Sequence, residues 1–458
     1  MRLSTACRPI RSRRSSHTQA RRASWVLIAS FLPAICSAAA SAPPSEFGVD
    51  APELARLGDF AVGVRTLFLV QPDQPDVLAF NPKTGVAPVR ERQLTVDLWY
   101  PAKPAVSATR EIYSATFPSE PPAAPVSFSV PGLAVRDARA AGGGYPLIVV
   151  SHGYSNAPAA MTWLTENLAS KGYVVAAIRH ADPPITYTAG FPQLLLRRPL
   201  DIAYVTRTLQ SMLATQHLID PERTALVGYS MGGYGVLTAA GAELDPAGPT
   251  VKLVPGGLLR PYAAGGAQRD SVLVKSLRAV VAISPAGGGS LAAWGEAGLR
   301  EISAPLLLIS GDNDQTIDYK TGARAMFDKA TGSHRYLLTF RGCGHSIGLN
   351  PVPEAMQDRL WDQDWFEDPV WRKDRINEIS AHFITAFLDL YVKGDTTRAD
   401  YLNVPVTSSS AGVWPARDSD AYDAYSPATG GITVWKGFQR NHAAGLELLQ
   451  AQAAPASH

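Results

Sequence analysis

The stretch Gly228-Tyr229-Ser230-Met231-Gly232 limits what this chain can fold into more than any other feature. It follows the apolar run 225–227, which is typical of a buried strand, and it precedes a helix-compatible segment at 234–242. A serine on so short a turn adopts strained backbone geometry, and the flanking glycines let strand and helix approach without a Cβ clash. We therefore expect Ser230 to stand exposed on this turn as a nucleophile.

Ionisable side chains follow two later strand-like runs and supply the partners that such a serine needs. The buried-strand pattern 305–310 ends just before Asp312 and Asp314, and a second such pattern ends just before His345. His345 is expected to act as the general base for Ser230, and a carboxylate to hold the imidazole in its working tautomer. We favour Asp314 for the carboxylate, with Asp312 as the alternative that only forms the turn.

A further strand-like run, 145–150, ends in Ser151-His152-Gly153-Tyr154. The anionic tetrahedral intermediate of acyl transfer needs preorganised hydrogen-bond donors, and we expect the backbone N–H groups of Tyr154 and Met231 to form this oxyanion hole. The N–H of Met231 also lies at the start of a predicted helix, where the dipole favours negative charge. His152 is expected to brace the turn through hydrogen bonds.

Strands and helices alternate along the central part of the sequence. Such alternation predicts an α/β fold with a mostly parallel, doubly wound sheet and an active site at the carboxyl ends of the strands. Residues 101–144, rich in Pro, Ala and Gly, are expected to form a loop with short strands on the sheet edge. The predicted strands are 94–100, 146–150, 173–179, 223–228, 277–283, 305–310 and 335–340, and the predicted helices are 158–171, 197–217, 231–242 and 376–392.

We assign residues 59–400 to one catalytic domain with two insertions. Residues 245–275 are rich in Gly and Pro and are interpreted as a cap or lid. Residues 350–372 contain the aromatic residues Trp361, Trp365, Phe366 and Trp371. These either line a substrate pocket or cover the last predicted helix. Tyr229 is also expected in the pocket. Residues 401–458 are expected to form a C-terminal extension. Its part 408–428 is typical of a loose tail, and 431–449 are apolar enough to pack against the body of the fold as a strand.

The N-terminus has the composition of a secretory signal. Residues 1–40 hold seven arginines and no acidic residue, and the apolar run 25–35 leads into small residues near Ala38 and Ala40, where we expect cleavage. A membrane anchor is disfavoured because the run is too short. We expect export to the periplasm or beyond, by the general or the twin-arginine route, followed by a Pro/Ala-rich lead-in at 41–58.

Charge and cysteine content narrow the partners of the mature chain. The chain has 42 basic and 40 acidic residues, so removing the seven leader arginines leaves 35 against 40, a net charge of −5. Nucleic-acid binding and stable membrane insertion after cleavage are therefore not expected. Only Cys343 remains outside the leader, as a small buried filler. Metal-binding and phosphate-binding motifs are not apparent, and serine chemistry needs no cofactor.

With these residues in place, the chain resembles bacterial serine esterases of the α/β-hydrolase superfamily related to platelet-activating-factor acetylhydrolases and dienelactone hydrolases. Cutinases and polyester hydrolases are similar around Tyr154, Ser230-Met231 and Asp314. Dienelactone hydrolases use a cysteine where this chain has Ser230, and plasma-type acetylhydrolases place the acid where this chain reads Ile283-Ser284-Pro285. The likeness runs from about 146 to 394 and is carried by 150–154, 168–180 and 228–232.

The resemblance implies a secreted carboxylester hydrolase that acts through an acyl-enzyme on Ser230. Because no basic cluster is available to hold an anionic acyl group, a neutral or hydrophobic ester, small or polymeric, is the expected substrate. One alternative is an esterase with lipase-like, cutinase-like or phospholipase specificity. The others are an amidase or peptidase that uses the same residues, and an inactive protein that only binds its ligand. The sequence leaves the oligomeric state open.

Overall fold

A computed structural model describes residues 47–105, 107–413, 433–439 and 442–455. The predicted leader 1–40, the beginning of the lead-in 41–58 and most of the expected tail 408–428 lie outside these ranges. Within the described part, no helix combines the length and the apolar character that crossing a membrane requires.

The described residues form one 11-stranded sheet, in the order β11-β10-β9-β8-β7-β5-β6-β2-β1-β4-β3. Strands β5 to β10 run parallel, whereas β2 pairs antiparallel with β6 and β11 pairs antiparallel with β10. The predicted α/β class with a mostly parallel sheet is therefore confirmed. The strands are β1 Ala61–Pro75, β2 Val89–Ala102, β3 Arg110–Phe117, β4 Val126–Arg136, β5 Tyr145–Ser151, β6 Val174–Arg179, β7 Ile219–Tyr229, β8 Leu277–Ile283, β9 Leu306–Gly311, β10 Arg335–Phe340 and β11 Leu446–Ala451.

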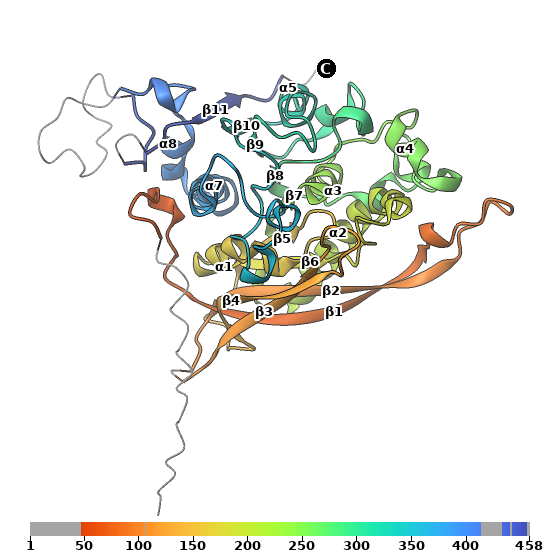
Figure 1. Ribbon diagram of the computed structural model, residues 1–458, viewed down its shortest axis with the longest axis horizontal. Coiled ribbons are helices and arrows are strands. Elements are labelled where there is room, and N and C mark those ends of the chain that lie inside the picture. The colour runs from red at the N-terminus through yellow and green to blue at the C-terminus, as the bar shows by residue number, and fades with distance from the viewer. Residues whose placement is uncertain (1–46, 106, 414–432, 440–441, 456–458) are drawn as a thin grey trace, which may run out of the picture. The chain divides into compact units, whose positions relative to one another are not determined.

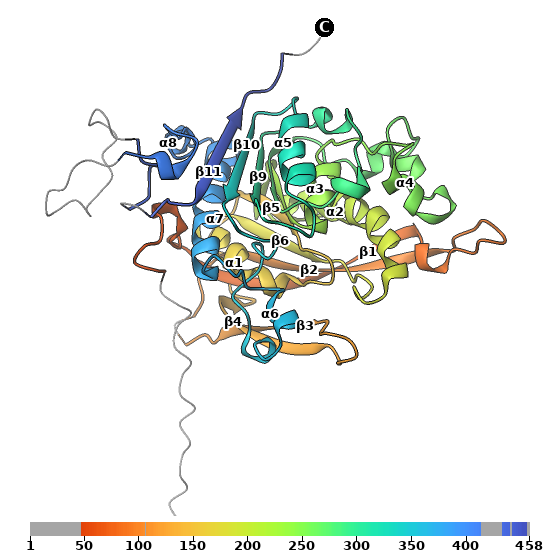
Figure 2. The same cartoon turned by 45° about the horizontal axis from the view of Figure 1, so that its top comes forward.

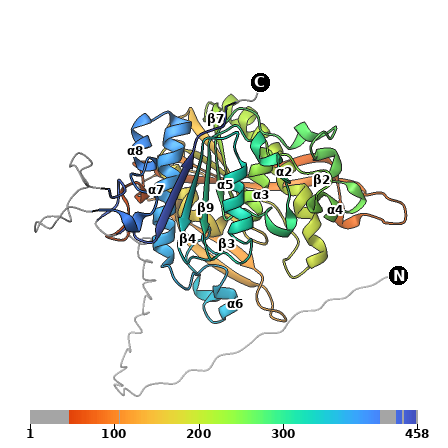
Figure 3. The ribbon, with the colours of Figure 1, turned by 90° about the horizontal axis from the view of Figure 1, so that it is seen from above.

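Helices cover both faces of the central strands (Figure 1), and Figure 3 shows the strands between α7 on one side and α3 on the other. Leu147 and Val149 of β5 belong to a core that includes residues of α2 and α3, while Ile148 and Val150 face a second core with α1 and α7. A strand buried on both faces must be apolar throughout, which explains its continuous run. The helices are α1 Thr162–Ser170, α2 Phe191–Thr215, α3 Met231–Ala239, α4 Pro249–Leu253, α5 Ala325–Lys329, α6 Leu360–Gln363, α7 Lys373–Leu388 and α8 Ala399–Leu402.

Three elements differ from the expectation. Helix α2 begins at Phe191 and not at 197, because Pro192 lies in its first turn, where a missing N–H needs no acceptor. Residues 101–144 do reach the sheet edge, but they form the strands β3 and β4, which are longer than expected. Buried and exposed side chains alternate along much of β3. Strand β1 was not predicted, and it pairs antiparallel with β2 along most of its length.

The C-terminal extension returns to the sheet. Strand β11 pairs with β10 at the edge of the parallel region, as Figure 2 shows. Leu446 and Leu448 of this strand are buried in the core that contains α1 and α7. The expectation of a returning strand within 431–449 is confirmed, and the strand continues to Ala451.

Candidate active site

Ser230 lies on the sharp turn between β7 and α3, at the carboxyl end of the sheet. Its backbone has φ 53° and ψ −116°, a left-handed value of φ that a non-glycine residue rarely adopts. A Cβ atom on Gly232 would lie 1.9 Å from the carbonyl oxygen of Ser151, and one on Gly228 would lie 2.3 Å from the carbonyl oxygen of Gly232. Both glycines are therefore required for the close approach of α3, β7 and β5.

Replacing Gly232 by alanine is expected to lower the free energy of unfolding by about 3 kcal/mol, because the new methyl group meets backbone that cannot move aside cheaply. Thermal and urea unfolding of the purified variant measure this. Gly142→Ala is the matched control: its Cβ would meet only the Tyr145 hydroxyl, at 3.1 Å, so a change within about 0.5 kcal/mol is expected. Equal stability of the two variants would contradict the packing described here.

The side chains of Ser230, His345 and Asp314 form one line of hydrogen bonds. Ser230 Oγ lies 3.1 Å from His345 Nε2, and His345 Nδ1 lies 2.7 Å from Asp314 Oδ2. A carboxylate only accepts, so Nδ1–H donates to Asp314, which leaves Nε2 free to accept the Ser230 proton. Asp314 is fully buried, and its Oδ1 accepts the N–H groups of Thr316 and Ile317 at 3.0 and 3.2 Å.

Asp312, the alternative carboxylate, lies elsewhere. Its Oδ1 accepts the N–H of Gly342 at 2.5 Å, and its Oδ2 lies 3.3 Å from the Arg341 guanidinium. Asp312 therefore stabilises the turn that carries His345, whereas the hydrogen bond to the His345 imidazole is made by Asp314.

Tyr154 and Met231, the two expected oxyanion donors, both line the cavity in front of Ser230. Met231 is the first residue of α3, so its N–H has no acceptor within the helix. Tyr154 follows β5 on the turn that contains His152 and Gly153. Tyr154 and Met231 thus follow the neighbouring strands β5 and β7, and their role as oxyanion donors stays a prediction.

The cavity next to Ser230 measures about 430 Å³ and is mainly apolar. Trp361 of α6 and Trp365 stand in its wall with ring centroids 5.7 Å apart. Tyr229, also expected in the pocket, lines it too, and its hydroxyl donates to the carbonyl oxygen of His345 at 3.1 Å. The lining residues are Tyr154, Asn156, Ile185, Phe191, Tyr229, Ser230, Met231, Ala286, Leu291, Thr316, Ile317, His345, Ser346, Trp361, Asp364 and Trp365.

The other two aromatic residues of 350–372 do not reach this cavity. Phe366 is fully buried and stacks on Phe117 of β3 with centroids 5.3 Å apart, and Trp371 packs edge-on against Phe340 of β10. Two of the four aromatics therefore line the cavity, whereas the ring contacts of Phe366 and Trp371 given above are with strands β3 and β10, and not with the last predicted helix.

Residues 245–275 contribute no side chain to the described lining of the cavity. They form α4 and short 3-10 turns, and Val251, Val254 and Leu259 are buried in the core shared with α2 and α3. In this structure the segment predicted as a lid therefore does not contact the candidate site.

Several wall residues were not expected from the sequence. Ile185, Phe191, Leu291 and Ile317 come from connections that follow β6, β8 and β9. The only signal for them was their position after strand carboxyl ends, where sites of such folds lie.

Cys343 is free and buried, and burial raises the pKa of its thiol, in keeping with the expected role as a filler. Among the described residues, no three His, Cys, Asp or Glu side chains gather as they would around a metal ion.

Part of this chain is similar to known ester hydrolases. A protein family described as PET hydrolase-like matches residues 126–251, which include Tyr154, Ser230 and Met231. Cutinase est2 of Thermobifida alba is 34% identical over 101 residues, or 22% of this chain and 32% of that cutinase. Cutinase 2 of Thermobifida cellulosilytica is 33% identical over 101 residues, or 36% of its length. The matched region thus spans about a third of the length of these curated relatives.

Among solved structures, the ferulic acid esterase from Streptomyces cinnamoneus superposes on 75% of this chain and 94% of its own, with a TM-score of 0.50 and 20% sequence identity. This likeness shows the fold. The predicted similarity to α/β-hydrolase esterases with cutinase-like and polyester-hydrolase-like motifs is confirmed.

Proposed function

We propose that this chain, which has the α/β-hydrolase fold, is an exported serine carboxylester hydrolase. The observation that carries the proposal is the hydrogen-bonded line from Ser230 through His345 to Asp314, which opens onto an apolar cavity. The matched family and the cutinase relatives support the same reaction class.

In the proposed reaction, Ser230 Oγ attacks the ester carbonyl carbon while its proton passes to His345 Nε2. Asp314 stabilises the imidazolium that forms. The N–H groups of Tyr154 and Met231 donate to the developing oxyanion. The intermediate then collapses, the C–O bond to the alcohol breaks, and His345 returns the proton to the leaving alcohol. Water, deprotonated by His345, hydrolyses the acyl-enzyme in the second half and restores Ser230.

The cavity favours a neutral acyl group with an aromatic or hydrophobic body. The described lining contains no lysine or arginine that would pair with a carboxylate, and Asp364 would repel one. Trp361, Trp365 and Phe191 present aromatic surface on which a flat acyl group can stack. Polymeric esters are the second candidate, and the PET hydrolase-like match is the observation that favours them.

Hydrolysis of a para-nitrophenyl ester series from acetate to palmitate by the mature protein tests this function. With an ester whose deacylation is slower than its acylation, we expect a rapid burst of nitrophenol equal to the enzyme concentration, followed by slower turnover, because the acyl-enzyme then accumulates. Matched para-nitroanilides should react far more slowly. A folded protein that cleaves anilides as fast as esters would favour an amidase, and one that cleaves neither would contradict the proposal.

Truncating the aromatic wall is expected to change specificity more than turnover. Trp361→Ala should raise KM for an aromatic acyl ester, such as a ferulate, by about tenfold through loss of ring contact, and change KM for the acetate little. Trp361→Phe, which keeps a ring, should stay near wild type. If all three proteins show the same ratio of the two KM values, Trp361 does not contact the acyl group.

Export is a separate part of the proposal. The leader 1–40 should be removed, so that the protein recovered from the periplasm or the medium begins close to residue 39 or 41. Mass spectrometry of its N-terminal peptide measures this directly, and a full-length chain retained in the cytoplasm would contradict export.

A further inference from the structure

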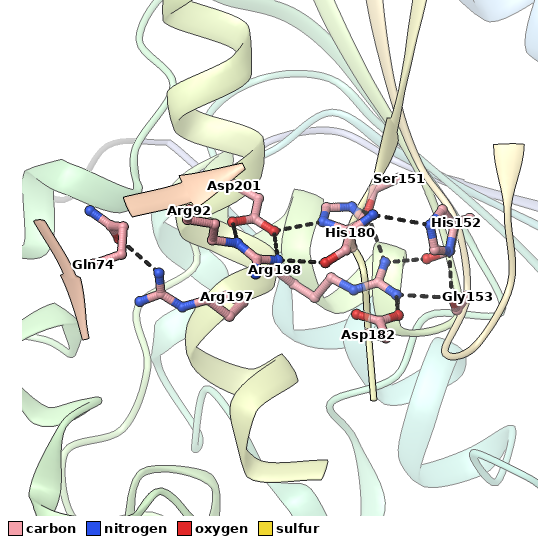
Figure 4. Close-up of polar contacts among 10 residues, drawn as sticks. All are labelled: Gln74, Arg92, Ser151, His152, Gly153, His180, Asp182, Arg197, Arg198 and Asp201. Carbon is pink, nitrogen blue, oxygen red and sulfur yellow. Dashed lines mark hydrogen bonds and ion pairs between the residues drawn. The ribbon is translucent and has the colours of Figure 1, made fainter. Parts of the chain in front are cut away.

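A buried polar network includes Ser151, His152 and Gly153 (Figure 4), the three residues that precede Tyr154 in the chain. Helix α2 supplies Arg198 and, one turn later, Asp201, and both side chains are fully buried. Sequence patterns did not single out either residue. The proposed function assigns no role to them, although they contact the end of β5 and the loop after β6.

The guanidinium of Arg198 binds the three residues that precede Tyr154. Nη1 donates to the carbonyl oxygen of His152 and lies 3.2 Å from Ser151 Oγ. Nη2 donates to the carbonyl oxygen of Gly153 at 2.9 Å and to Asp182, whose side chain is 5% exposed and balances the charge. All four Nη hydrogens are thereby used, in a fork geometry that a lysine cannot reproduce.

The carbonyl of Gly153 accepts from two further donors besides Arg198, because His152 Nδ1 donates to it at 2.7 Å and the N–H of Asn156 at 3.4 Å. This carbonyl and the N–H of Tyr154 belong to the same peptide unit. Among the described peptide bonds only Pro121-Pro122 is cis, so this unit is trans, and its C=O and N–H point in opposite directions. With the carbonyl fixed towards Arg198, the N–H of Tyr154 faces away from the network.

We propose that Arg198 is a positioning residue that fixes the Gly153-Tyr154 peptide and thereby presents the Tyr154 N–H as a preset oxyanion donor. The inference rests on the proposed function. A cation on the carbonyl side also polarises the peptide and makes its N–H a stronger donor. Arg198 acts through the backbone and does not touch substrate.

A second layer holds the same turn. His180 Nε2 lies 2.9 Å from Ser151 Oγ, His180 Nδ1 lies 2.9 Å from Asp201 Oδ2, and Arg92 binds both oxygens of Asp201 at 2.7 Å. Burial, together with the charge of Arg198, lowers the pKa of His180 to about 3, so the ring is neutral. Its Nδ1–H then donates to Asp201, its Nε2 accepts from Ser151, and the Ser151 oxygen remains free to accept from Arg198.

Arg197, the neighbour of Arg198, provides a matched control. Its side chain is also buried, but Figure 4 shows it pointing the opposite way, where Nη1 donates to Gln74 Oε1 at 2.8 Å. Among the described residues, its guanidinium bonds to Gln74 and not to Ser151, His152 or Gly153, and its Nε and Nη2 have no partner there. Both positions 197 and 198 of α2 thus carry a buried cation, and only that of Arg198 contacts the turn of residues 151–153.

The test compares Arg198→Lys with Arg197→Lys by ester kinetics and by binding of a trifluoromethyl ketone. Such a ketone forms a tetrahedral oxyanion on the serine. We expect Arg198→Lys to lower kcat by about 100-fold, as loss of an oxyanion donor does, and to weaken ketone binding by a similar factor. KM should change by less than about threefold, because the ground state does not use this donor fully. Arg197→Lys should resemble the wild type in all three quantities.

Circular dichroism melting shows whether each variant is folded. The burst amplitude gives the fraction of its molecules that carry a functional active site. If Arg198→Lys fails to fold, His152→Phe replaces it. This change removes the Nδ1 donor to the Gly153 carbonyl, together with the Nε2 atom that accepts the N–H of His180 at 3.5 Å. It should lower kcat and ketone affinity by about tenfold and leave KM nearly unchanged. Unchanged kcat and ketone affinity in the folded variant, or a loss explained by fewer active sites, would overturn the positioning role. A wild-type protein without esterase activity would overturn both proposals, whereas an active wild type leaves the two separable.

Discussion

Ser230→Ala is expected to lower kcat for ester hydrolysis by about 10⁶-fold, to the level that binding and the oxyanion donors sustain alone. The change removes the attacking oxygen that lies 3.1 Å from His345 Nε2 and leaves a methyl group that fits the turn. KM for the same ester should stay close to the wild-type value. Initial rates with a para-nitrophenyl ester, at protein concentrations high enough to detect residual turnover, measure the effect.

Ser284→Ala is the matched control for this loss. Ser284 follows the neighbouring strand β8, is fully buried, and its hydroxyl has no partner among the described residues. Its removal should change kcat by less than about twofold, because no hydrogen bond is lost. Retention of more than about one hundredth of the wild-type rate by Ser230→Ala would be incompatible with an acyl-enzyme on this residue.

The second large effect is expected at the carboxylate. Asp314→Asn should lower kcat by about 10⁴-fold. An asparagine amide can donate to Nδ1 of His345, which favours the tautomer that carries its proton on Nε2, and that nitrogen then no longer accepts from Ser230. Burial of Asp314 and its two backbone donors hold the replacement in the same place, so the geometry is preserved while the proton is misplaced.

Asp312→Asn separates the two neighbouring carboxylates. Asp312 accepts the N–H of Gly342, a bond that the asparagine oxygen can keep, so we expect a loss of less than about tenfold. The test compares the kcat of Asp312→Asn with that of Asp314→Asn, each measured across a pH range. A larger loss at Asp312 than at Asp314 would reverse the assignment of the acid.

Much of the fold could be predicted because the sheet is buried on both faces. Strands 277–283 and 335–340 contain the apolar runs 279–283 and 336–338, and their predicted bounds match the structure. The edge strands were harder to predict. Strand β3 buries alternate residues, and the apolar run 67–70 of β1 is half-buried or exposed in the structure and stands among polar residues. The predicted helix 197–217 begins six residues after the start of α2, because the helix-start signal of Pro192 in the first turn was not used.

The hydrogen-bonded line of Ser230, His345 and Asp314 could be predicted because each of these residues follows a core strand within a few residues. The pocket wall and the network behind it could not, since they depend on contacts between distant segments. Arg198 and Ser151 are 47 residues apart, and nothing local to Arg198 distinguishes it from Arg197. Only the path of α2 over the ends of β5 and β6 decides which of the two arginines reaches the turn.

Covalent labelling of the active wild-type protein by a para-nitrophenyl phosphonate tests the central claim most directly. The reagent should place its phosphonyl group on Ser230 with release of one nitrophenol per protein and loss of esterase activity in parallel. Tryptic mapping should find the added mass on peptide 224–252, in which Ser230 is the only serine. Complete inactivation with the label on another peptide, or persistent activity after stoichiometric labelling of Ser230, would contradict an acyl-enzyme at this residue.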